Sequence, residues 1–144
     1  MTKLHFPALV LCTIGLSSCK TYYMSTQGLK DQFAGIDSSQ LVDVVMKGPV
    51  GDVYRYKANP ITVIKCLDKN GRPAELMNGP SIEMRITHRG KKTIFYFDRV
   101  FVGDSTVKGV RSRFLESVTA TIPLRDITKI EVQNGRKNFQ YVSK

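Results

Sequence analysis

Tryptophan is absent from this chain of 144 residues, which contains only two histidines and three cysteines. Beyond residue 19 the only histidine is His88, so a histidine-based metal site or a Ser-His-Asp triad would depend on this one residue. His88 precedes the basic sequence Arg89-Gly90-Lys91-Lys92, which is typical of an exposed hairpin loop. Without tryptophan, a stacking surface for sugars would have to come from tyrosine or phenylalanine.

The common catalytic and nucleotide-binding motifs are also missing. The chain has no Gly-x-Ser-x-Gly elbow, no phosphate-binding Gly-x-x-x-x-Gly-Lys-Ser/Thr loop, no His-Glu-x-x-His and no Cys-x-x-Cys. The glycines of Gly48-Pro49-Val50-Gly51-Asp52 precede no predicted helix that could direct its amides at a phosphate. We therefore expect no catalytic residue, no metal site and no cofactor, and we do not expect an enzyme.

Acidic residues leave one enzymatic alternative open. Asp98, Asp104, Glu116 and Asp126 are scattered through the region where we expect a sheet. A glycosidase needs two carboxyl groups about 5 to 9 Å apart across a cleft, a separation that sequence spacing on an unknown sheet does not give. The alternative to a non-catalytic role is thus a small periplasmic hydrolase acting on cell-envelope carbohydrate.

The first nineteen residues have the pattern of an export signal. Lys3 precedes an apolar run from Leu4 to Leu16, which is shorter than the roughly 20 residues of a spanning helix, and the run ends in Leu16-Ser17-Ser18-Cys19. This sequence resembles the lipobox of bacterial lipoproteins. The resemblance implies that Cys19 receives a diacylglycerol thioether, that residues 1–18 are removed, and that the new amino terminus is acylated, for instance with palmitate. Two or three acyl chains make membrane attachment effectively permanent.

Two alternatives to lipidation are an ordinary secretory signal cleaved elsewhere and an uncleaved anchor. Residues 20–25 show no helical period, and we expect residues 19–25 to be the lipidated cysteine and a short tether, followed by a single domain over residues 26–144. In Gram-negative lipoproteins an Asp after the lipidated cysteine is associated with retention in the inner membrane. Lys20 occupies this position here, so the resemblance implies the outer membrane, with the domain facing the periplasm.

The net charge of the chain limits the class of partner that it suits. The chain has 22 basic and 12 acidic side chains, a formal net charge of +10, and removal of residues 1–18 takes away only one lysine. Export argues against nucleic acid as the partner and favours anionic envelope components, although basic side chains also serve solubility.

Cys66 would remain without a disulfide partner, and we expect it to be a small buried apolar residue.

Hydrophobic periodicity predicts a mainly β fold. Residues 26–36 favour one short helix, with Thr26 as its expected cap. Apolar and polar residues alternate over 81–87, 118–124 and 128–133, as in half-buried strands. Residues 93–102 are apolar on both faces, which predicts a central strand covered on two sides.

Turn residues recur about every ten positions and support an antiparallel arrangement. Asn70-Gly71 and Asn134-Gly135 favour two-residue hairpin loops, and Arg89-Gly90 and Gly103-Asp104 are weaker versions of this signal. We expect about six to eight strands in a single antiparallel unit, either a small barrel or a two-layer sandwich. The segment Ala120 to Val132 also resembles the closing strands of small, uncharacterised β-rich lipoproteins.

A binding role is the sharper expectation. Arg111 and Arg113 are two residues apart, which would place them on one face of a strand, and Arg89, Lys91 and Lys92 cluster at one turn. These five residues are the candidate anion site, which competes with a simpler interpretation as unconnected surface loops. Residues 138–142 are expected at a sheet edge, where they could accept a strand from another envelope protein.

Overall fold

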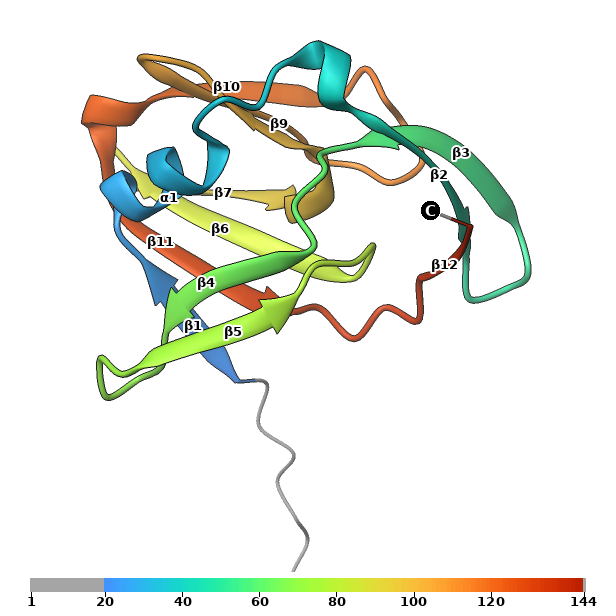
Figure 1. Cartoon of the computed structure of the whole chain (residues 1–144), viewed down its shortest axis with the longest axis horizontal. Coiled ribbons are helices and arrows are strands. Elements are labelled where there is room, and N and C mark those ends of the chain that lie inside the picture. The colour runs from blue at the N-terminus through green and yellow to red at the C-terminus, as the bar shows by residue number, and fades with distance from the viewer. Residues whose placement is uncertain (1–19, 144) are drawn as a thin grey trace, which may run out of the picture.

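A computed structural model of the chain describes residues 20–143. The expected signal peptide and Cys19 therefore lie outside the described residues. The described residues form twelve strands, one α-helix and three short 3-10 helices (Figure 1). In chain order the strands and α-helix are β1 (Thr21–Met24), α1 (Thr26–Phe33), β2 (Val42–Lys47), β3 (Val53–Ala58), β4 (Val63–Leu67), β5 (Pro73–Met77), β6 (Ile82–His88), β7 (Lys91–Tyr96), β8 (Val100–Val102), β9 (Thr106–Val110), β10 (Thr119–Pro123), β11 (Ile127–Asn134) and β12 (Gln140–Ser143).

The strands form three sheets, and every strand pair is antiparallel. The largest sheet has the order β5-β4-β1-β11-β6-β7, and two three-stranded sheets have the orders β10-β9-β8 and β12-β2-β3. None of the sheets of the described chain closes into a barrel, so the barrel alternative is wrong. The expected mainly β character is confirmed, but twelve strands replace the six to eight expected, because the chain turns from one sheet to another at several short breaks.

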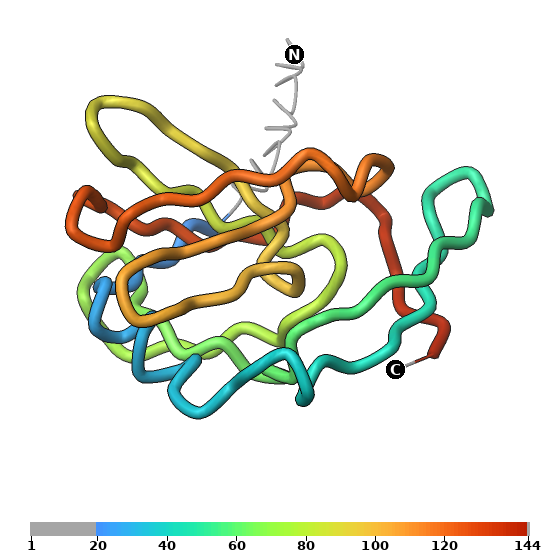
Figure 2. Tube along the Cα trace, turned by 90° about the horizontal axis from the view of Figure 1, so that it is seen from above, coloured from blue at the N-terminus to red at the C-terminus, as the bar shows by residue number. Residues whose placement is uncertain are grey.

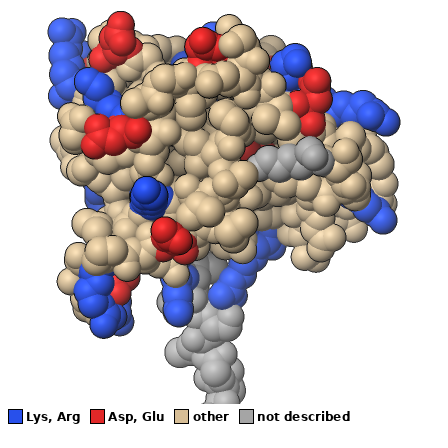
Figure 3. All heavy atoms as spheres, in the orientation of Figure 1, with Lys and Arg blue, Asp and Glu red and all other residues tan. Residues whose placement is uncertain are grey.

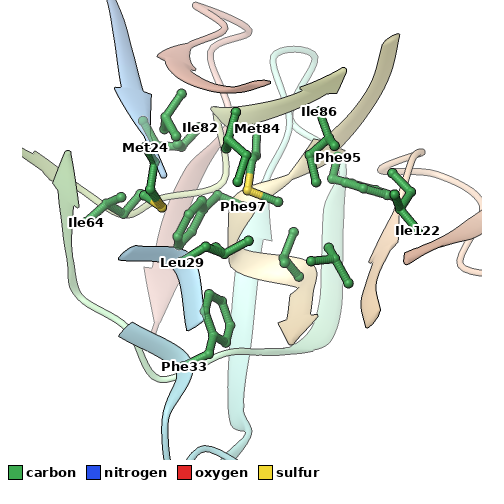
Figure 4. Packing of buried hydrophobic residues seen from close by; sticks show 14 of the residues in the cluster. Met24, Leu29, Phe33, Ile64, Ile82, Met84, Ile86, Phe95, Phe97 and Ile122 are labelled. Carbon is green, nitrogen blue, oxygen red and sulfur yellow. The ribbon is translucent and has the colours of Figure 1, made fainter. Parts of the chain in front are cut away.

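The main hydrophobic core lies between the six-stranded sheet, the β10-β9-β8 sheet and α1. Ile82, Met84 and Ile86 of β6 point into it, and Phe95 and Phe97 fill its centre (Figure 4). Each fully buried aliphatic side chain of this kind contributes about 1.5 to 3 kcal/mol. A second, smaller core lies on the β12-β2-β3 sheet, which forms a separate wing at one end of the molecule (Figure 2).

The predicted central strand over residues 93–102 is wrong. β7 ends at Tyr96, residues Phe97–Arg99 form a 3-10 turn, and β8 continues in a different sheet. The Asn59 side chain donates hydrogen bonds to the carbonyl oxygens of Phe97 at 2.7 Å and Val100 at 3.2 Å, which satisfies backbone groups freed at this corner. The segment is apolar on both faces because it passes through the core between two sheets.

The structure confirms only some of the turns predicted at glycine residues. Arg89 and Gly90 have φ values of 46° and 71° and form a two-residue loop between β6 and β7. Gly71, with φ of 76°, lies in the turn between β4 and β5, although that turn is longer than two residues. The hairpin predicted at Asn134-Gly135 is wrong, since β12 pairs with β2 rather than with β11.

The N-cap of the helix lies one residue before the predicted cap. The Ser25 hydroxyl accepts a hydrogen bond from the Gly28 amide at 2.9 Å, so Ser25 is the N-cap and Thr26 the first helical residue. Leu29 and Phe33 lie on one face and are buried against the main core. The helix thus covers one end of the sheet, as the spacing of its apolar residues predicts.

The start of the domain differs from the expectation of a tether over residues 19–25. Thr21–Met24 is not a linker but strand β1, paired with β11 on one side and with β4 on the other. Tyr22 faces Val132, and Met24 faces Ile130 in the core. The folded domain therefore begins at Thr21, two residues after Cys19, rather than at residue 26.

Candidate functional site

Two basic residues of the candidate anion site, Arg89 and Lys92, pair with different acids. Arg89 pairs with Asp126 at 2.8 Å, and Lys92 lies 3.5 Å from Glu131. Lys91 is exposed at the start of β7. These residues lie at the hairpin between β6 and β7.

Arg111 and Arg113 do not share the face of a strand. β9 ends at Val110, and within the following loop Arg111 is exposed while the Arg113 side chain is completely buried. Arg113 contacts Asp98, just beyond the end of β7, whereas Lys91 begins this strand. Six residues of strand span about 20 Å, so the structure does not bring all five residues together. Arg113 is also unavailable to a surface ligand.

The densest polar cluster of the described chain surrounds Asp98 and Arg113. The Arg113 guanidinium donates to both carboxylate oxygens of Asp98, at 2.7 and 3.2 Å, and to the carbonyl oxygen of Pro80. The hydroxyls of Tyr56 and Tyr141 donate to the same carboxylate at 2.5 and 2.6 Å. We call Tyr56, Asp98, Arg113 and Tyr141 the buried Asp98 cluster.

This cluster is built to hold elements together. Its residues come from β3, from the corner after β7, from the loop after β9 and from β12, so it joins the β12-β2-β3 sheet to the rest of the domain. Burial and the Asp98 charge raise the pKa of both Tyr56 and Tyr141 far above the usual range of a tyrosine. Both hydroxyls stay protonated at neutral pH and donate to the Asp98 carboxylate.

Aromatic rings enclose the same cluster. The Arg113 guanidinium lies 3.9 Å from the centre of the Tyr96 ring, and Arg99 lies 4.8 Å from that of Tyr56. Phe139 packs edge-on against Tyr96 at 6.4 Å. The rings exclude water, which strengthens the ionic hydrogen bonds of the cluster.

A second charged group lies on the outer face of the six-stranded sheet. Glu83 accepts from Lys137 at 2.8 Å and from Arg85 at 3.3 Å, and Glu131 pairs with Lys129 at 3.0 Å. Burial raises the pKa of both carboxyl groups, but their lysine and arginine partners outweigh it, so each pKa lies below its usual value. Both acids are ionised at neutral pH and serve as counter-ions for this basic face.

Several other residues singled out from the sequence have structural partners, and Asp104 is exposed. Asp126 is held by Arg89, and Glu116, which is largely exposed, lies 3.3 Å from Arg99. The His88 ring is 2.9 Å from the Thr93 hydroxyl. Burial, followed by the charge of Glu75, raises the pKa of the Cys66 thiol, and this cysteine is buried as expected. Among residues 20–143 no group of three or more His, Cys, Asp or Glu side chains is placed to hold a metal ion.

A surface hollow lies where β6 begins and β11 ends. It has a volume of about 470 Å³ and lies between the segment leading into β6 and the segment linking β11 to β12. Ser81, Asn134, Arg136 and Asn138 contribute polar groups to its walls, and Phe139 contributes an apolar one. Arg136 and Asn138 have φ values of 51° and 52°, which shape this wall.

Comparisons with known proteins do not supply a function. No family model matches the chain, and neither the curated proteins nor the solved structures include a significant match. Within the part of the chain that the structure describes, no helix is long and apolar enough to cross a membrane. The function must therefore be argued from the residues themselves.

Sequence reasoning missed the buried Asp98 cluster. Its four members are distant along the chain, and no local motif connects Tyr56, Arg113 and Tyr141. One signal was present, since Asp98 and Arg99 interrupt an otherwise apolar run, and charged residues inside such a run require buried partners. Their partners could only be found once the sheets were placed.

Proposed function

We propose that this chain is a lipid-anchored cell-envelope protein with a non-catalytic binding or structural role. The observation that carries the proposal is the position of β1, which begins two residues after the lipobox cysteine, Cys19. Two residues of extended chain span at most about 7 Å. A lipid on Cys19 would thus hold the six-stranded sheet directly against a membrane, which suits a domain that works at the bilayer surface.

The arrangement of the acidic residues favours binding over hydrolysis. Asp98 accepts hydrogen bonds from three side chains, and Asp126 and Glu116 are each paired with an arginine. A carboxyl group of a glycosidase needs access to the sugar and, for the general acid, a raised pKa. The partners of Asp98 and Asp126 enclose these two carboxyl groups and leave them little access to a sugar, whereas Glu116 is exposed beside Arg99.

Strand β12 offers a route to a protein partner. It lies at the edge of its sheet and pairs only with β2 among the described strands. An edge strand leaves backbone groups available for a strand of another chain. An envelope protein is therefore the second candidate partner, next to an anionic glycan or lipid, and the outer membrane facing the periplasm is the proposed location.

The anchor is tested by expressing the full chain in a Gram-negative host and separating membranes from soluble protein. We expect the Cys19→Ser variant to leave the membrane fraction, while the matched Cys12→Ser variant remains there because residue 12 is removed with the leader. Intact mass spectrometry should find a wild-type chain that starts at Cys19 and carries diacylglycerol and a further acyl group. A retained leader with an unmodified Cys19 would contradict the proposal.

The non-catalytic role has its own test. The solubilised protein is assayed on purified envelope polysaccharides and in parallel used to recover bound components from envelopes. We expect recovery of a partner without hydrolysis. Hydrolysis that disappears in Asp104→Asn or Glu116→Gln, both at exposed positions, would instead support the hydrolase alternative.

A further inference from the structure

Three segments leave the six-stranded sheet at the end where β1 begins. Thr21 pairs with Gln133, so the segment after β11 continues beyond the start of β1. Tyr23 pairs with Leu67, the last residue of β4, so the turn over residues 68–72 extends past β1 on its other side. Figure 1 shows both segments along the lower border of the domain, on either side of the start of β1.

These segments bring basic side chains to the same end of the domain. We call this surface the anchor-proximal face, and its basic residues are Lys20, Lys69, Arg72, Arg136 and Lys137, all of which are exposed. Two acids balance them in part, since Asp68 pairs with Arg72 at 2.9 Å and the buried Glu83 pairs with Lys137 at 2.8 Å. The face therefore keeps a positive excess, and Lys and Arg side chains gather along the lower border in Figure 3.

The hollow described above opens at this end as well. Ile82, which starts β6, pairs with Asn134 at the end of β11, and both residues line the hollow. Arg136 and Asn138 are among the residues that line it. Arginine binds phosphate oxygens through two parallel hydrogen bonds, and amide groups donate to the same oxygens. The hollow is thus suited to a phosphate group presented from outside.

We propose that the anchor-proximal face lies flat on the bilayer and binds the phosphate groups of anionic phospholipids. This inference rests on the proposed function, because the lipid on Cys19 is what brings this face to the membrane. The peptide bond between Cys19 and Lys20 leaves no tether, so the basic residues are held near the headgroups, within reach of a surface potential that decays over about 8 to 10 Å. A protein partner on this face would have to displace the membrane that the anchor imposes.

The test uses the mature, lipidated protein reconstituted into phosphatidylcholine vesicles with or without phosphatidylglycerol. An environment-sensitive fluorophore is attached through Asn70→Cys in the turn between β4 and β5, and spin-labelled lipids serve as quenchers. Cys66 is buried and Cys19 is alkylated, so the new thiol is the one that reacts. The matched control carries the fluorophore through Lys91→Cys, at the hairpin on the opposite end of β6.

We expect strong quenching at residue 70 in anionic vesicles, weak quenching in neutral vesicles, and little quenching at residue 91 in either. High salt should reverse the effect at residue 70 while the protein stays anchored. Lys69→Glu combined with Arg136→Glu should lower the quenching at residue 70 in anionic vesicles, since each basic residue near an anionic surface strengthens contact of the face with the bilayer by roughly fivefold. The matched Lys91→Glu change should leave the quenching at residue 70 unaltered.

Two results would overturn the inference while leaving the anchor intact. One is equal quenching at residue 70 in neutral and anionic vesicles, which would remove the role of charge. The other is an anchored protein whose residue 70 is not quenched in either, which would place the face away from the bilayer. A protein whose mass lacks the lipid and that fails to join vesicles would overturn both proposals, so the two failures are distinguishable.

Discussion

Arg113 lies 2.7 Å from Asp98, and both side chains are completely removed from solvent. Asp98 comes from the 3-10 turn after β7 and Arg113 from the loop after β9, and the two tyrosines that share the Asp98 carboxylate come from the β12-β2-β3 sheet. A buried ion pair of this kind adds little net stability over an apolar pair of equal size, but the loss of one partner leaves an uncompensated charge. The pair therefore fixes how the sheets dock.

Asp98→Ala should lower the free energy of unfolding by about 3 to 5 kcal/mol, because Arg113 would stay buried without its counter-ion. Asp43→Ala is the matched control, since Asp43 pairs with Lys57 at 3.0 Å on an exposed surface. We expect a loss below about 1 kcal/mol there. Urea unfolding measures both, and equal losses would contradict the assigned role of the buried pair.

Gly109→Ala should destabilise the domain by about 1 to 3 kcal/mol, because the structure leaves no room for a side chain at this position. An added Cβ would lie 2.5 Å from the Phe95 ring, which is itself completely buried. Gly79→Ala is the control, since its Cβ would meet no atom within 4 Å. Thermal unfolding compares the two variants. An unchanged unfolding temperature for Gly109→Ala would contradict the close packing of Gly109 against Phe95.

Stability should fall in acid, partly through Glu83. Its folded pKa lies below the ordinary value of 4.5, since Lys137 and Arg85 outweigh the effect of burial. The stabilisation is therefore complete above pH 4.5 and is lost as the pH falls through the folded pKa. Lys137→Gln should reduce this acid dependence, whereas Lys108→Gln, on exposed β9 surface, should not. Unfolding free energies measured across this pH range compare the two, and identical profiles would contradict the role of the pair.

Ser25→Ala should cost about 1 kcal/mol of stability, because the Gly28 amide would lose its hydrogen-bond acceptor. Thr26→Ala distinguishes a cap at Ser25 from the cap predicted at Thr26, since Thr26 is already helical in the structure. We expect a smaller effect for Thr26→Ala, because alanine is the better helix former. Denaturant unfolding measures the free energy lost in each variant, and a larger loss for Thr26→Ala than for Ser25→Ala would favour Thr26 as the cap.

Particular residues show how far sequence reasoning reaches. The alternation of Ile82, Met84 and Ile86 with polar residues correctly predicts β6, because one face of a strand must be apolar wherever one face is buried. The same reasoning failed at residues 93–102, since a strand covered on both faces and a corner between two sheets give the same apolar run. It also failed at Thr21–Met24, a short strand without a strong pattern that is held by its neighbours.

The sequence by itself determined the mainly β character, the short helix and the burial of Cys66, because these depend on local periodicity and on the transfer of apolar side chains from water. It also contains the segment Leu16-Ser17-Ser18-Cys19, whose resemblance to a lipobox underlies the proposed function. Only the tertiary structure decided the three sheets, the burial of Arg113 and the place of Thr21–Met24 as a strand of the largest sheet. These features depend on contacts between residues far apart in the chain, which local patterns do not encode.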